Sequence, residues 1–338
     1  MRSTHTQAAV LGQARGPVTI ESIYVGEPGA GEVLLRMEAC GVCHSDLFVA
    51  GLEKLPLAPL TLGHEGIARV ESVGAGVSQW SPGDRAGITF LGTTCGDCEW
   101  CGSGRERFCP KQTNFGYTLH GALTEYAIVP AAALVRVPEG LPAAEAAPLC
   151  CAGWTAYGAL REAGVERGRS VALFGLGGLG HLALQLARAQ GLRVAAVDVN
   201  DDKLHMAREG GAEITVQGES AGRTLQKEYG GVDAALVLTP SSAAIHQAFR
   251  SLKRTGTLVL VGLAMSQYEL PLVDTVLKGI TVRGSYLGTR QDLAEVFALA
   301  AAGAIRAHVQ THSLSDVPGV LERLRRGELM GRSVIAWC

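Results

Sequence analysis

A glycine-rich turn constrains the fold of this chain more than any other feature of its sequence. The turn joins an apolar run over 171–174 to a helical pattern over 179–190, and its residues are Gly175, Leu176, Gly177, Gly178, Leu179 and Gly180. In a G-x-G-x-x-G turn, the first glycine makes the bend and the second lets the backbone approach a pyrophosphate, while the third lets the helix pack against the strand. The turn therefore predicts a dinucleotide site, with phosphates at a helix N-terminus.

Strand-like and helix-like segments alternate after the turn. The expected strands are 193–197, 232–238 and 257–262, and the expected helices are 201–209, capped by Asn200 or Asp201, and 241–252. Such alternation predicts a parallel sheet with helices on both faces.

Asp198 bears on the choice of dinucleotide. It ends the second expected strand, 18 residues after Gly180. A carboxylate there accepts hydrogen bonds from the adenosine ribose hydroxyls and repels a 2′-phosphate. No arginine follows it directly, so the pattern favours NAD over NADP.

The first 150 residues have a different character. Short β-like runs at 32–37, 66–73, 85–90 and 124–129 are separated by turns that contain Gly and Pro. This pattern is typical of an irregular, largely β domain. At the other end of the chain, helical segments 292–302 and 314–325 precede a short strand at 333–337, and we expect this tail to return to the first domain.

Four cysteines within fifteen residues form a tight cluster, namely Cys95, Cys98, Cys101 and Cys109. Four thiolates around one tetrahedral ion make a closed structural zinc site. An iron–sulfur cluster is the competing interpretation, because four cysteines can also hold one. A third interpretation is that the four cysteines are reduced and unrelated to one another.

A second, dispersed group could hold a catalytic metal. It combines Cys43, within the motif 40–46, with His64, within the turn 63–66, and with Cys151. A catalytic zinc has three protein ligands and one open position. Taken alone, His64 could equally be a buried structural histidine. We expect Cys40, Cys150 and Cys338 to be structural or incidental.

The composition excludes several kinds of partner. A length of 338 residues suggests about two domains. Lys and Arg number 30 and Asp and Glu 32, and a net charge of −2 gives no reason to expect nucleic acid or anionic lipid as partner. Nine cysteines, mostly clustered, favour metal over disulfides. Since neither a signal-peptide pattern nor an apolar run of about 18 residues is present, we expect no membrane partner and a cytoplasmic location.

Taken together, these motifs resemble the zinc-dependent medium-chain alcohol dehydrogenases, particularly their bacterial and yeast-like tetrameric branch. The resemblance covers nearly the whole chain, through segments 40–46, 63–66, 95–109, 151–155, 175–180, 276–285, 288–290 and 331–334. It implies an α/β fold. A GroES-like, mostly β catalytic domain over 1–150 and 291–338 would carry both zinc sites, with a Rossmann NAD-binding domain over 151–290 inserted. It also implies a homotetramer, with a dimer as the alternative.

The resemblance also assigns roles to individual residues. It implies Cys43, His64 and Cys151 as ligands of the catalytic zinc, with Glu65 approaching the metal when the fourth position is vacant. It implies that Asp46 orients the histidine ligand and that Ser45 receives the alcohol proton. The cofactor contacts that it implies outside the glycine turn are His44 and Arg332 at the pyrophosphate, Asp198 and Lys203 at the adenosine ribose, and Thr155 and Val261.

The implied activity is reversible hydride transfer between NAD(H) and primary or secondary alcohols and the matching aldehydes or ketones. Two zinc ions per subunit are expected, one structural and one serving as Lewis acid. The alternatives are a cinnamyl- or allylic-type aldehyde reductase that uses NADPH, a polyol dehydrogenase, and a non-catalytic nucleotide-binding relative.

One position departs from the family pattern. Yeast-like members usually carry a histidine three residues after the relay hydroxyl, where this chain has Phe48, which cannot titrate. We expect either that Phe48 lines the substrate or cofactor cleft and favours carbonyl reduction or bulkier substrates, or that the change is neutral. The other expected pocket residues are Phe90, Leu91, Phe115, Trp154 and Leu287. His120 is also unusual for its position.

Overall fold

A computed structural model describes residues 4–263 and 267–337. The chain forms two compact units: unit 1 is made from Met1–Cys151, Thr289–Ala301 and Ala307–Cys338, and unit 2 from Ala152–Gly288 and Ala302–Arg306. Cys338, which we expected to be structural or incidental, lies outside the described residues. Within the described ranges, no helix combines the length and apolar character needed to cross a membrane.

Unit 2 is built on one parallel six-stranded sheet. The strand order is β11-β10-β9-β12-β13-β14, with β9 (Ser170–Phe174), β10 (Arg193–Asp198), β11 (Ile214–Gln217), β12 (Val232–Val237), β13 (Leu252–Leu260) and β14 (Thr281–Gly284). Every neighbouring pair is parallel. Numbered within the unit, this is the 3-2-1-4-5-6 order of a dinucleotide-binding sheet, which confirms the predicted fold class.

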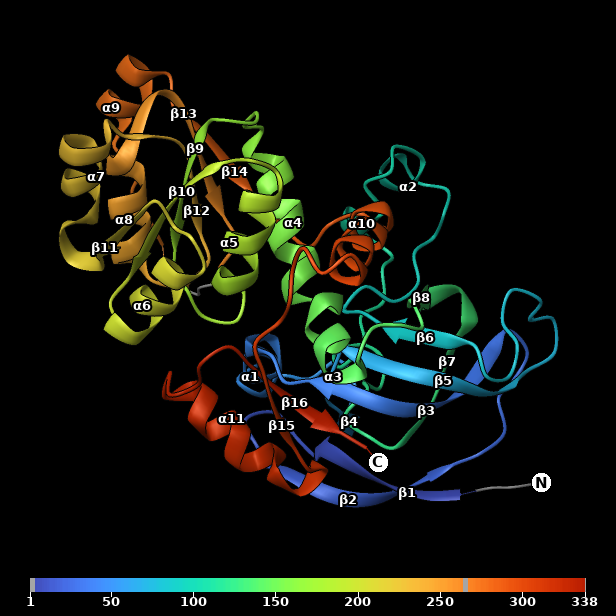
Figure 1. Cartoon of the computed structure of the whole chain (residues 1–338). Coiled ribbons are helices and arrows are strands. Elements are labelled where there is room, and N and C mark those ends of the chain that lie inside the picture. Colours follow the sequence, from blue (N-terminus) through green and yellow to red (C-terminus); the bar gives the residue numbers. More distant parts are fainter. Residues whose placement is uncertain (1–3, 264–266, 338) are drawn as a thin grey trace. The chain divides into compact units, whose positions relative to one another are not determined.

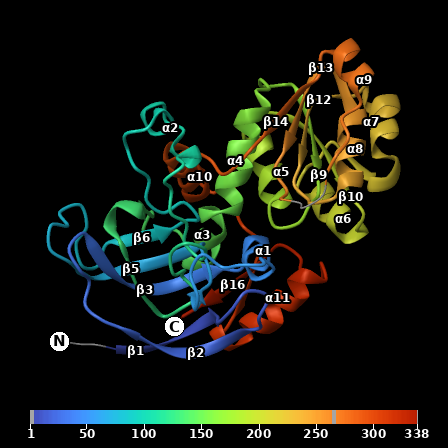
Figure 2. The same cartoon turned by 180° about the vertical axis from the view of Figure 1, so that it is seen from behind.

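Helices cover both faces of this sheet. They are α4 (Ala152–Ala163), α5 (Gly180–Ala189), α6 (Asp201–Glu209), α7 (Ala221–Tyr229), α8 (Ser242–Ser251) and α9 (Leu272–Lys278). In Figures 1 and 2, α7, α8 and α9 lie on one face and α4 and α5 on the other. Of the two predicted caps, Asn200 begins α6, because its side chain accepts a hydrogen bond from the Lys203 N–H at 3.1 Å.

One strand of unit 2 begins earlier than predicted. The sequence indicated a strand from residue 257, whereas β13 starts at Leu252. Leu252 pairs with Val232, but the next pair in register is Thr257 with Ala234, so the ladder is irregular between them. Thr255 there has a φ of +61°. The first half of this strand is polar and irregularly paired, so the apolar pattern of the sequence did not predict it.

The described residues of unit 1 form two sheets. The smaller has the order β2-β1-β4, with β1 (Thr4–Leu11), β2 (Val18–Val25) and β4 (Leu60–Thr61). The larger has the order β15-β16-β3-β5-β6-β8, with β7 also paired to β3. Its strands are β3 (Glu32–Gly41), β5 (Gly66–Val73), β6 (Arg85–Ile88), β7 (Tyr126–Pro130), β8 (Val135–Arg136), β15 (Val309–His312) and β16 (Arg332–Ala336).

The C-terminal segments complete unit 1. Antiparallel pairing joins β16 to β3, with Val334 opposite Gly41 and Ile335 opposite Cys40. Figures 1 and 2 show the red β16 beside the blue β3. The helices of this unit are α1 (His44–Ala50), α2 (Glu99–Gly102), α3 (Ala143–Ala146), α10 (Arg290–Ala301) and α11 (Val317–Arg325). The strands β15 and β16 of the tail therefore belong to the larger sheet of unit 1, whereas Ala302–Arg306 belongs to unit 2.

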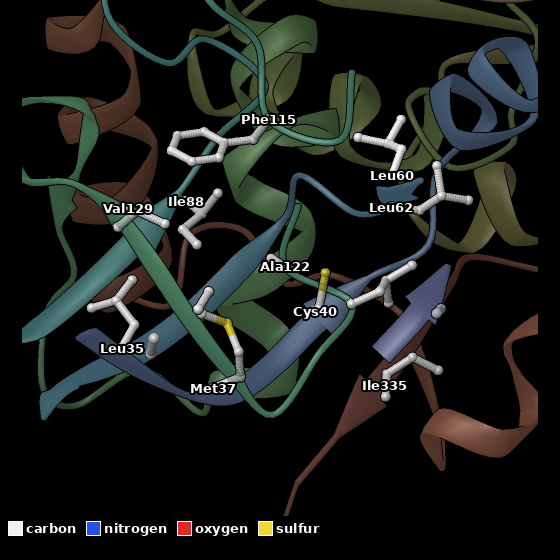
Figure 3. Close-up of a cluster of buried hydrophobic side chains, with 14 of the residues drawn as sticks. Leu35, Met37, Cys40, Leu60, Leu62, Ile88, Phe115, Ala122, Val129 and Ile335 are labelled. Carbon is white, nitrogen blue, oxygen red and sulfur yellow. The ribbon is translucent and has the colours of Figure 1, made fainter. Parts of the chain in front are cut away.

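A hydrophobic core includes side chains from the larger sheet of unit 1. Leu35 and Met37 of β3, Ile88 of β6, Phe115 and Ile335 belong to it, each with at most 2% exposure (Figure 3). Burying each such side chain stabilises the fold by about 1.5–3 kcal/mol. Ile335 shows that the C-terminal strand contributes to this core.

Candidate metal centres and nucleotide site

Four buried ligand groups converge in unit 1. Cys43 immediately precedes α1, His64 and Glu65 lie between β4 and β5, and Cys151 immediately precedes α4. One ligand atom from each residue lies within 4.8 Å of the others, and the sulfur atoms of Cys43 and Cys151 are 3.9 Å apart. The fold thus brings together residues that are far apart in the sequence.

Asp46 organises this cluster. Its carboxylate accepts hydrogen bonds from the backbone N–H of Cys43 at 2.8 Å and of Gly63 at 3.2 Å. The same carboxylate lies 3.4 Å from Nδ1 of His64. A carboxylate on Nδ1 fixes the ring orientation and leaves Nε2 to face a metal, as is usual for histidine ligands.

The electrostatics of the cluster fit a bound cation. The pKa of Cys43 is lowered well below its usual value, first by a hydrogen bond from the Cys151 thiol and, against burial, by His64 and Arg332. The pKa of Cys151 is raised, first because its thiol donates that hydrogen bond to Cys43, and further because it is buried and lies beside the Cys43 thiolate. Nε2 of His64 and Oε2 of Glu65 are buried and have no hydrogen-bond partner within the described ranges. A metal ion would stabilise both thiolates and satisfy these atoms.

Arg332 has a contact that sequence reasoning missed. Its guanidinium donates a hydrogen bond to Oε1 of Glu65, and the two side chains are 5% and 0% exposed. Burial raises the pKa of Glu65 to about 8, although Arg332 opposes this shift. We expected Arg332 at the cofactor pyrophosphate, and no sequence signal linked residues so far apart.

Gly41 explains how the Glu65 carboxylate fits beside the ligands. A Cβ atom on Gly41 would lie 2.0 Å from Oε2 of Glu65. The backbone N–H of Gly41 also donates to the Glu65 carbonyl at 3.0 Å. Any larger residue at position 41 would displace this carboxylate.

The hydroxyl expected to receive a proton lies beside the cluster. Oγ of Ser45 is 3.7 Å from the sulfur of Cys43, and Ser45 is half-buried. His44 precedes it at the start of α1 and is exposed. Phe90 also borders the cluster, because its ring packs edge-on against the His64 ring, with centroids 5.2 Å apart.

The remaining expected pocket residues fall in both units. Phe48, Phe90, Leu91 and Phe115 belong to unit 1, and Trp154 and Leu287 belong to unit 2. Phe48 is 40% exposed, whereas Phe115, at 1%, is a core residue of unit 1 (Figure 3). His120, for which the sequence offered no account, accepts a hydrogen bond from the Thr61 N–H at 3.3 Å, and burial lowers its pKa.

The second cysteine cluster has the dimensions of a site for one tetrahedral ion. The sulfur atoms of Cys98 and Cys101 are 3.5 Å apart, as are those of Cys95 and Cys109, and those of Cys95 and Cys101 are 4.0 Å apart. Four sulfurs at about 2.3 Å from one zinc would be about 3.8 Å from one another. A hydrogen bond from the Cys95 N–H helps to lower the pKa of Cys109 to about 7, which favours the thiolate that binds metal.

The glycine turn in unit 2 combines a left-handed bend, a tight helix contact and open space beside Gly177. Gly175 has a φ of +97°, which favours glycine. A Cβ atom on Gly180 would lie 2.1 Å from the Gly175 carbonyl oxygen, whereas one on Gly177 would meet nothing within 4 Å. The positive φ of Gly175 and the close packing at Gly180 are thus explained by the bend and by the helix, and Gly177 borders open space.

Asp198 is held rigidly at the end of β10. Its carboxylate accepts hydrogen bonds from the backbone N–H groups of Leu176 at 2.7 Å, Val199 at 2.8 Å and Asn200 at 3.0 Å. Lys203 lies in the first turn of α6, and Val261 directly follows β13. The acceptor carboxylate of Asp198 and the open space beside the glycine turn fit the adenosine half of a dinucleotide.

Comparisons with known proteins agree with these features. Residues 29–139 match the family described as alcohol dehydrogenase GroES-like domain, and residues 178–302 match that described as zinc-binding dehydrogenase. An alcohol dehydrogenase of Geobacillus stearothermophilus is 42% identical over 336 residues, which is 97% of this chain and 98% of the relative.

Two solved structures show the same likeness. The alcohol dehydrogenase of the hyperthermophilic archaeon Aeropyrum pernix is 32% identical, with a TM-score of 0.91 over 98% of this chain and 100% of its own. An acetophenone reductase from Geotrichum candidum NBRC 4597, solved in complex with NAD, is 30% identical, with a TM-score of 0.88 over 100% of this chain and 98% of its own.

Proposed function

Since the chain belongs to the zinc-dependent medium-chain alcohol dehydrogenase family, we propose that it interconverts primary or secondary alcohols with aldehydes or ketones, using NAD(H) and a catalytic zinc. The chain is an oxidoreductase that acts on alcohols, with zinc and a nucleotide as cofactors. We further propose that the nucleotide is NAD, that each subunit holds two zinc ions, and that the substrates are primary or secondary alcohols and the matching carbonyl compounds.

One observation carries the proposal above the others. The unpartnered Nε2 of His64 lies with the Cys43 and Cys151 thiols in a buried cluster that has a hydroxyl, Ser45, at its edge. Two thiolates and one imidazole form the catalytic zinc set known for alcohol dehydrogenases. A closed structural site would have no use for the adjacent hydroxyl.

Each residue of the site would have a separate role in catalysis. Cys43, His64 and Cys151 would hold the zinc, which supplies Lewis acidity and lowers the pKa of an alcohol hydroxyl. Asp46 would keep the imidazole of His64 in the orientation that binds metal. Ser45 would accept the hydroxyl proton at Oγ and pass it on. Glu65, paired with Arg332, would offer a further oxygen when the fourth position is vacant.

NAD is favoured by the charge at the end of β10. The carboxylate of Asp198, held by three backbone N–H groups, cannot turn away from a 2′-phosphate without losing those bonds. It can still accept hydrogen bonds from ribose hydroxyls, because each carboxylate oxygen has further lone pairs. NADP would place like charges together, which NAD avoids.

Phe48 leaves the proton path without a histidine after Ser45. Its side chain is 40% exposed, so the route from Ser45 to solvent would pass through the cofactor ribose and water, or through His44. We expect this to slow alcohol oxidation relative to carbonyl reduction. The Geotrichum candidum relative is named as a ketone reductase, which is consistent with this direction.

An exposed apolar surface supports the proposed homo-oligomer. Leu272, Val273, Val276 and Leu277 of α9 are 68–77% exposed. Beside them, within the described part of the chain, β14 pairs only with β13, and its four residues are exposed. A second copy related by a two-fold axis could pair with this edge and cover the apolar side chains. Light scattering after gel filtration should give a dimer or tetramer, and Val276→Glu should shift the mass towards the monomer.

A cytoplasmic location also belongs to the proposal. Its support is chemical: both metal sites depend on cysteines that stay reduced, as they do in a reducing compartment.

A substrate panel tests the proposed function directly. Zinc-loaded protein would be assayed with alcohols in the presence of NAD or NADP, and with aldehydes and ketones in the presence of NADH or NADPH. We expect turnover in both directions with a preference for NAD(H). A clear preference for NADPH would favour the aldehyde reductase alternative, and a lack of turnover on the whole panel would favour a non-catalytic nucleotide-binding protein.

A further inference from the structure

A groove in unit 2 lies apart from the metal centres and from the glycine turn. Its lining residues come from α7, α8 and α9, the three helices on one face of the parallel sheet (Figures 1 and 2). Its volume is about 510 Å³, and small-molecule pockets typically measure about 300–1,000 Å³. The groove is therefore large enough for a ligand of the size of a small metabolite.

The charges along the groove favour an anion. Arg223 of α7, Arg250 of α8 and Lys278 of α9 line it, and Asp274 is the one carboxylate among the described lining residues. Asp274 lies 3.6 Å from Lys278, one turn away on the same helix, so it compensates only that cation. With His246 of the lining counted as neutral, three cations and one carboxylate leave a net charge of +2.

The two arginines of the groove have no acceptor for their guanidinium groups. Within the described ranges, the side chains of Arg223 and Arg250 make no hydrogen bond or ion pair, whereas most arginines of unit 2 have a partner, as Arg193 has in Glu213 at 2.7 Å. One unpaired arginine at a surface is ordinary, and Arg167 is another example. Two in the same groove repel each other, and a bound anion would turn this repulsion into attraction.

The backbone that carries these arginines is fixed by contacts between α7 and α8. A Cβ atom on Gly222 would lie 2.7 Å from Cβ of Arg250, so the helices approach closely at the base of that side chain. The Gln226 side chain donates to the carbonyls of Arg250 at 3.2 Å and Leu252 at 2.8 Å, which satisfies the last carbonyls of α8. A ligand would therefore have to order side chains only, and not the backbone.

We propose that the groove between α7, α8 and α9 binds the phosphate group of a small molecule through Arg223, Arg250 and Lys278. A guanidinium presents its N–H donors in a planar fork that matches phosphate oxygens, and an ammonium adds a point charge. The net charge of +2 favours a doubly charged phosphate over a singly charged carboxylate. The inference is independent of the proposed function, because none of these residues holds a metal or the dinucleotide.

Two probes test this site, inorganic phosphate and the monoester glycerol 3-phosphate. Each would be titrated by calorimetry into the full-length, zinc-loaded protein at constant ionic strength, with and without saturating NAD⁺. We expect both probes to bind saturably, with dissociation constants that NAD⁺ does not change. The monoester should bind at least as tightly as free phosphate, because the groove has room for the rest of the molecule.

Substitutions in the groove should change binding in opposite directions. Arg223→Ala and Arg250→Ala should each weaken binding of both probes about ten-fold, because each removes a charge-assisted hydrogen bond. Asp274→Asn should strengthen binding, since it removes a charge that repels the anion, and a folding defect would not produce tighter binding. Arg167→Ala is the matched control, because it removes an exposed arginine of unit 2 that does not line the groove, and both constants should stay unchanged.

Several results would overturn the proposal. Neither probe might as well be present if binding is not saturable, if NAD⁺ abolishes it, or if Arg223→Ala and Arg250→Ala leave it unchanged. Equal weakening by Arg167→Ala and Arg223→Ala would show a response to overall charge rather than a site. Free phosphate that binds more tightly than the monoester would indicate an adventitious ion only.

Discussion

Glu65 and Arg332 lie 267 residues apart in the chain and form an ion pair in which neither side chain is more than 5% exposed. The carboxylate is also one of the four groups that converge around the candidate catalytic metal. The C-terminal strand β16 thus supplies the countercharge for a site whose ligands come from the first half of the chain. The pair has a consequence for stability that can be measured.

Arg332→Met should lower the free energy of unfolding by about 1–3 kcal/mol, because the buried Glu65 carboxyl loses a charge-assisted hydrogen bond and would be held in its protonated form. The double variant Glu65→Gln, Arg332→Met should recover much of this loss, since neither charge then remains buried. Denaturant unfolding of the zinc-loaded proteins measures both values. Equal destabilisation of the single and double variants would show that the packing of Arg332, rather than its charge, matters.

Cysteine substitutions should separate the two metal centres. Cys43→Ser should remove one zinc per subunit and abolish turnover while the fold is kept, whereas Cys98→Ser should remove the other zinc and lower the melting temperature. Metal analysis, circular dichroism and activity on the same samples give the three readouts. If Cys98→Ser kept its full zinc content, the four cysteines 95, 98, 101 and 109 would not hold zinc.

Asp198→Asn should shift cofactor preference towards NADPH by about ten-fold in the ratio of kcat/KM values, because it removes the charge that repels a 2′-phosphate. The asparagine oxygen can still accept the two hydrogen bonds from the Val199 and Asn200 N–H groups, whereas its NH₂ group cannot accept the third, from Leu176. Steady-state kinetics with NADH and NADPH measure the ratio. The exposed Asp201, which begins α6, provides the control: Asp201→Asn should leave the ratio unchanged.

Phe48→His should speed alcohol oxidation several-fold above about pH 7, because a histidine with a pKa near 6.5 could take the proton from the relay. The change should be larger for oxidation than for carbonyl reduction. Rate–pH profiles in both directions test it, with Tyr24→His, at a 65% exposed residue of β2, as control. An unchanged rate and profile would show that Phe48 is a neutral replacement.

Asp233 should make stability depend on acid pH. Burial alone would raise the pKa of Asp233, but hydrogen bonds from Ser170 and the charge of Lys253 lower it below its usual value. A carboxyl with a lowered pKa contributes stability above its unfolded pKa of about 3.9, and this contribution is lost as the pH falls through the folded value.

Asp233→Asn should therefore destabilise the protein by about 1–2 kcal/mol at pH 7, with the difference from the parent closing below about pH 4. Chemical denaturation at a series of pH values measures this. Glu228→Gln, at an exposed carboxylate of α7, should have little effect at any pH. A gap for Asp233→Asn that stays constant down to pH 3 would contradict the role given to its charge.

Local patterns predicted much of the fold. The glycine turn, the alternating strands after it and the Asn200 cap are consequences of local chemistry, and the structure contains all three. The first half of β13 was missed, because its register shift over polar residues has no apolar signature. The cysteine spacing likewise predicted one four-sulfur cluster, because all of its ligands come from one short loop.

Relations between distant residues were harder to predict. The residue types of Cys43, His64 and Cys151 suggested a metal site, but their roles as ligands were assigned only by resemblance to a family, since no spacing rule connects positions so far apart. The Glu65–Arg332 pair and the close approach of Gly41 to Glu65 depend on how β3, β5 and β16 meet in the folded chain. The same holds for the burial of Phe115 in the core, which its sequence neighbours do not reveal.

The pairing of β16 with β3 has a consequence for the order in which the chain can fold during synthesis. A ribosome delivers about 5–20 residues per second from the N-terminus, so all of Ala152–Gly288 emerges before β15 and β16 do. During that interval the larger sheet of unit 1 lacks two strands, and Glu65 lacks the guanidinium that neutralises it. Completion of the metal pocket is thereby tied to full translation of the nucleotide-binding unit. A chain cut short before Arg332 would leave the β3 edge unpaired and the buried Glu65 without its guanidinium, and an unpaired edge of this kind favours aggregation.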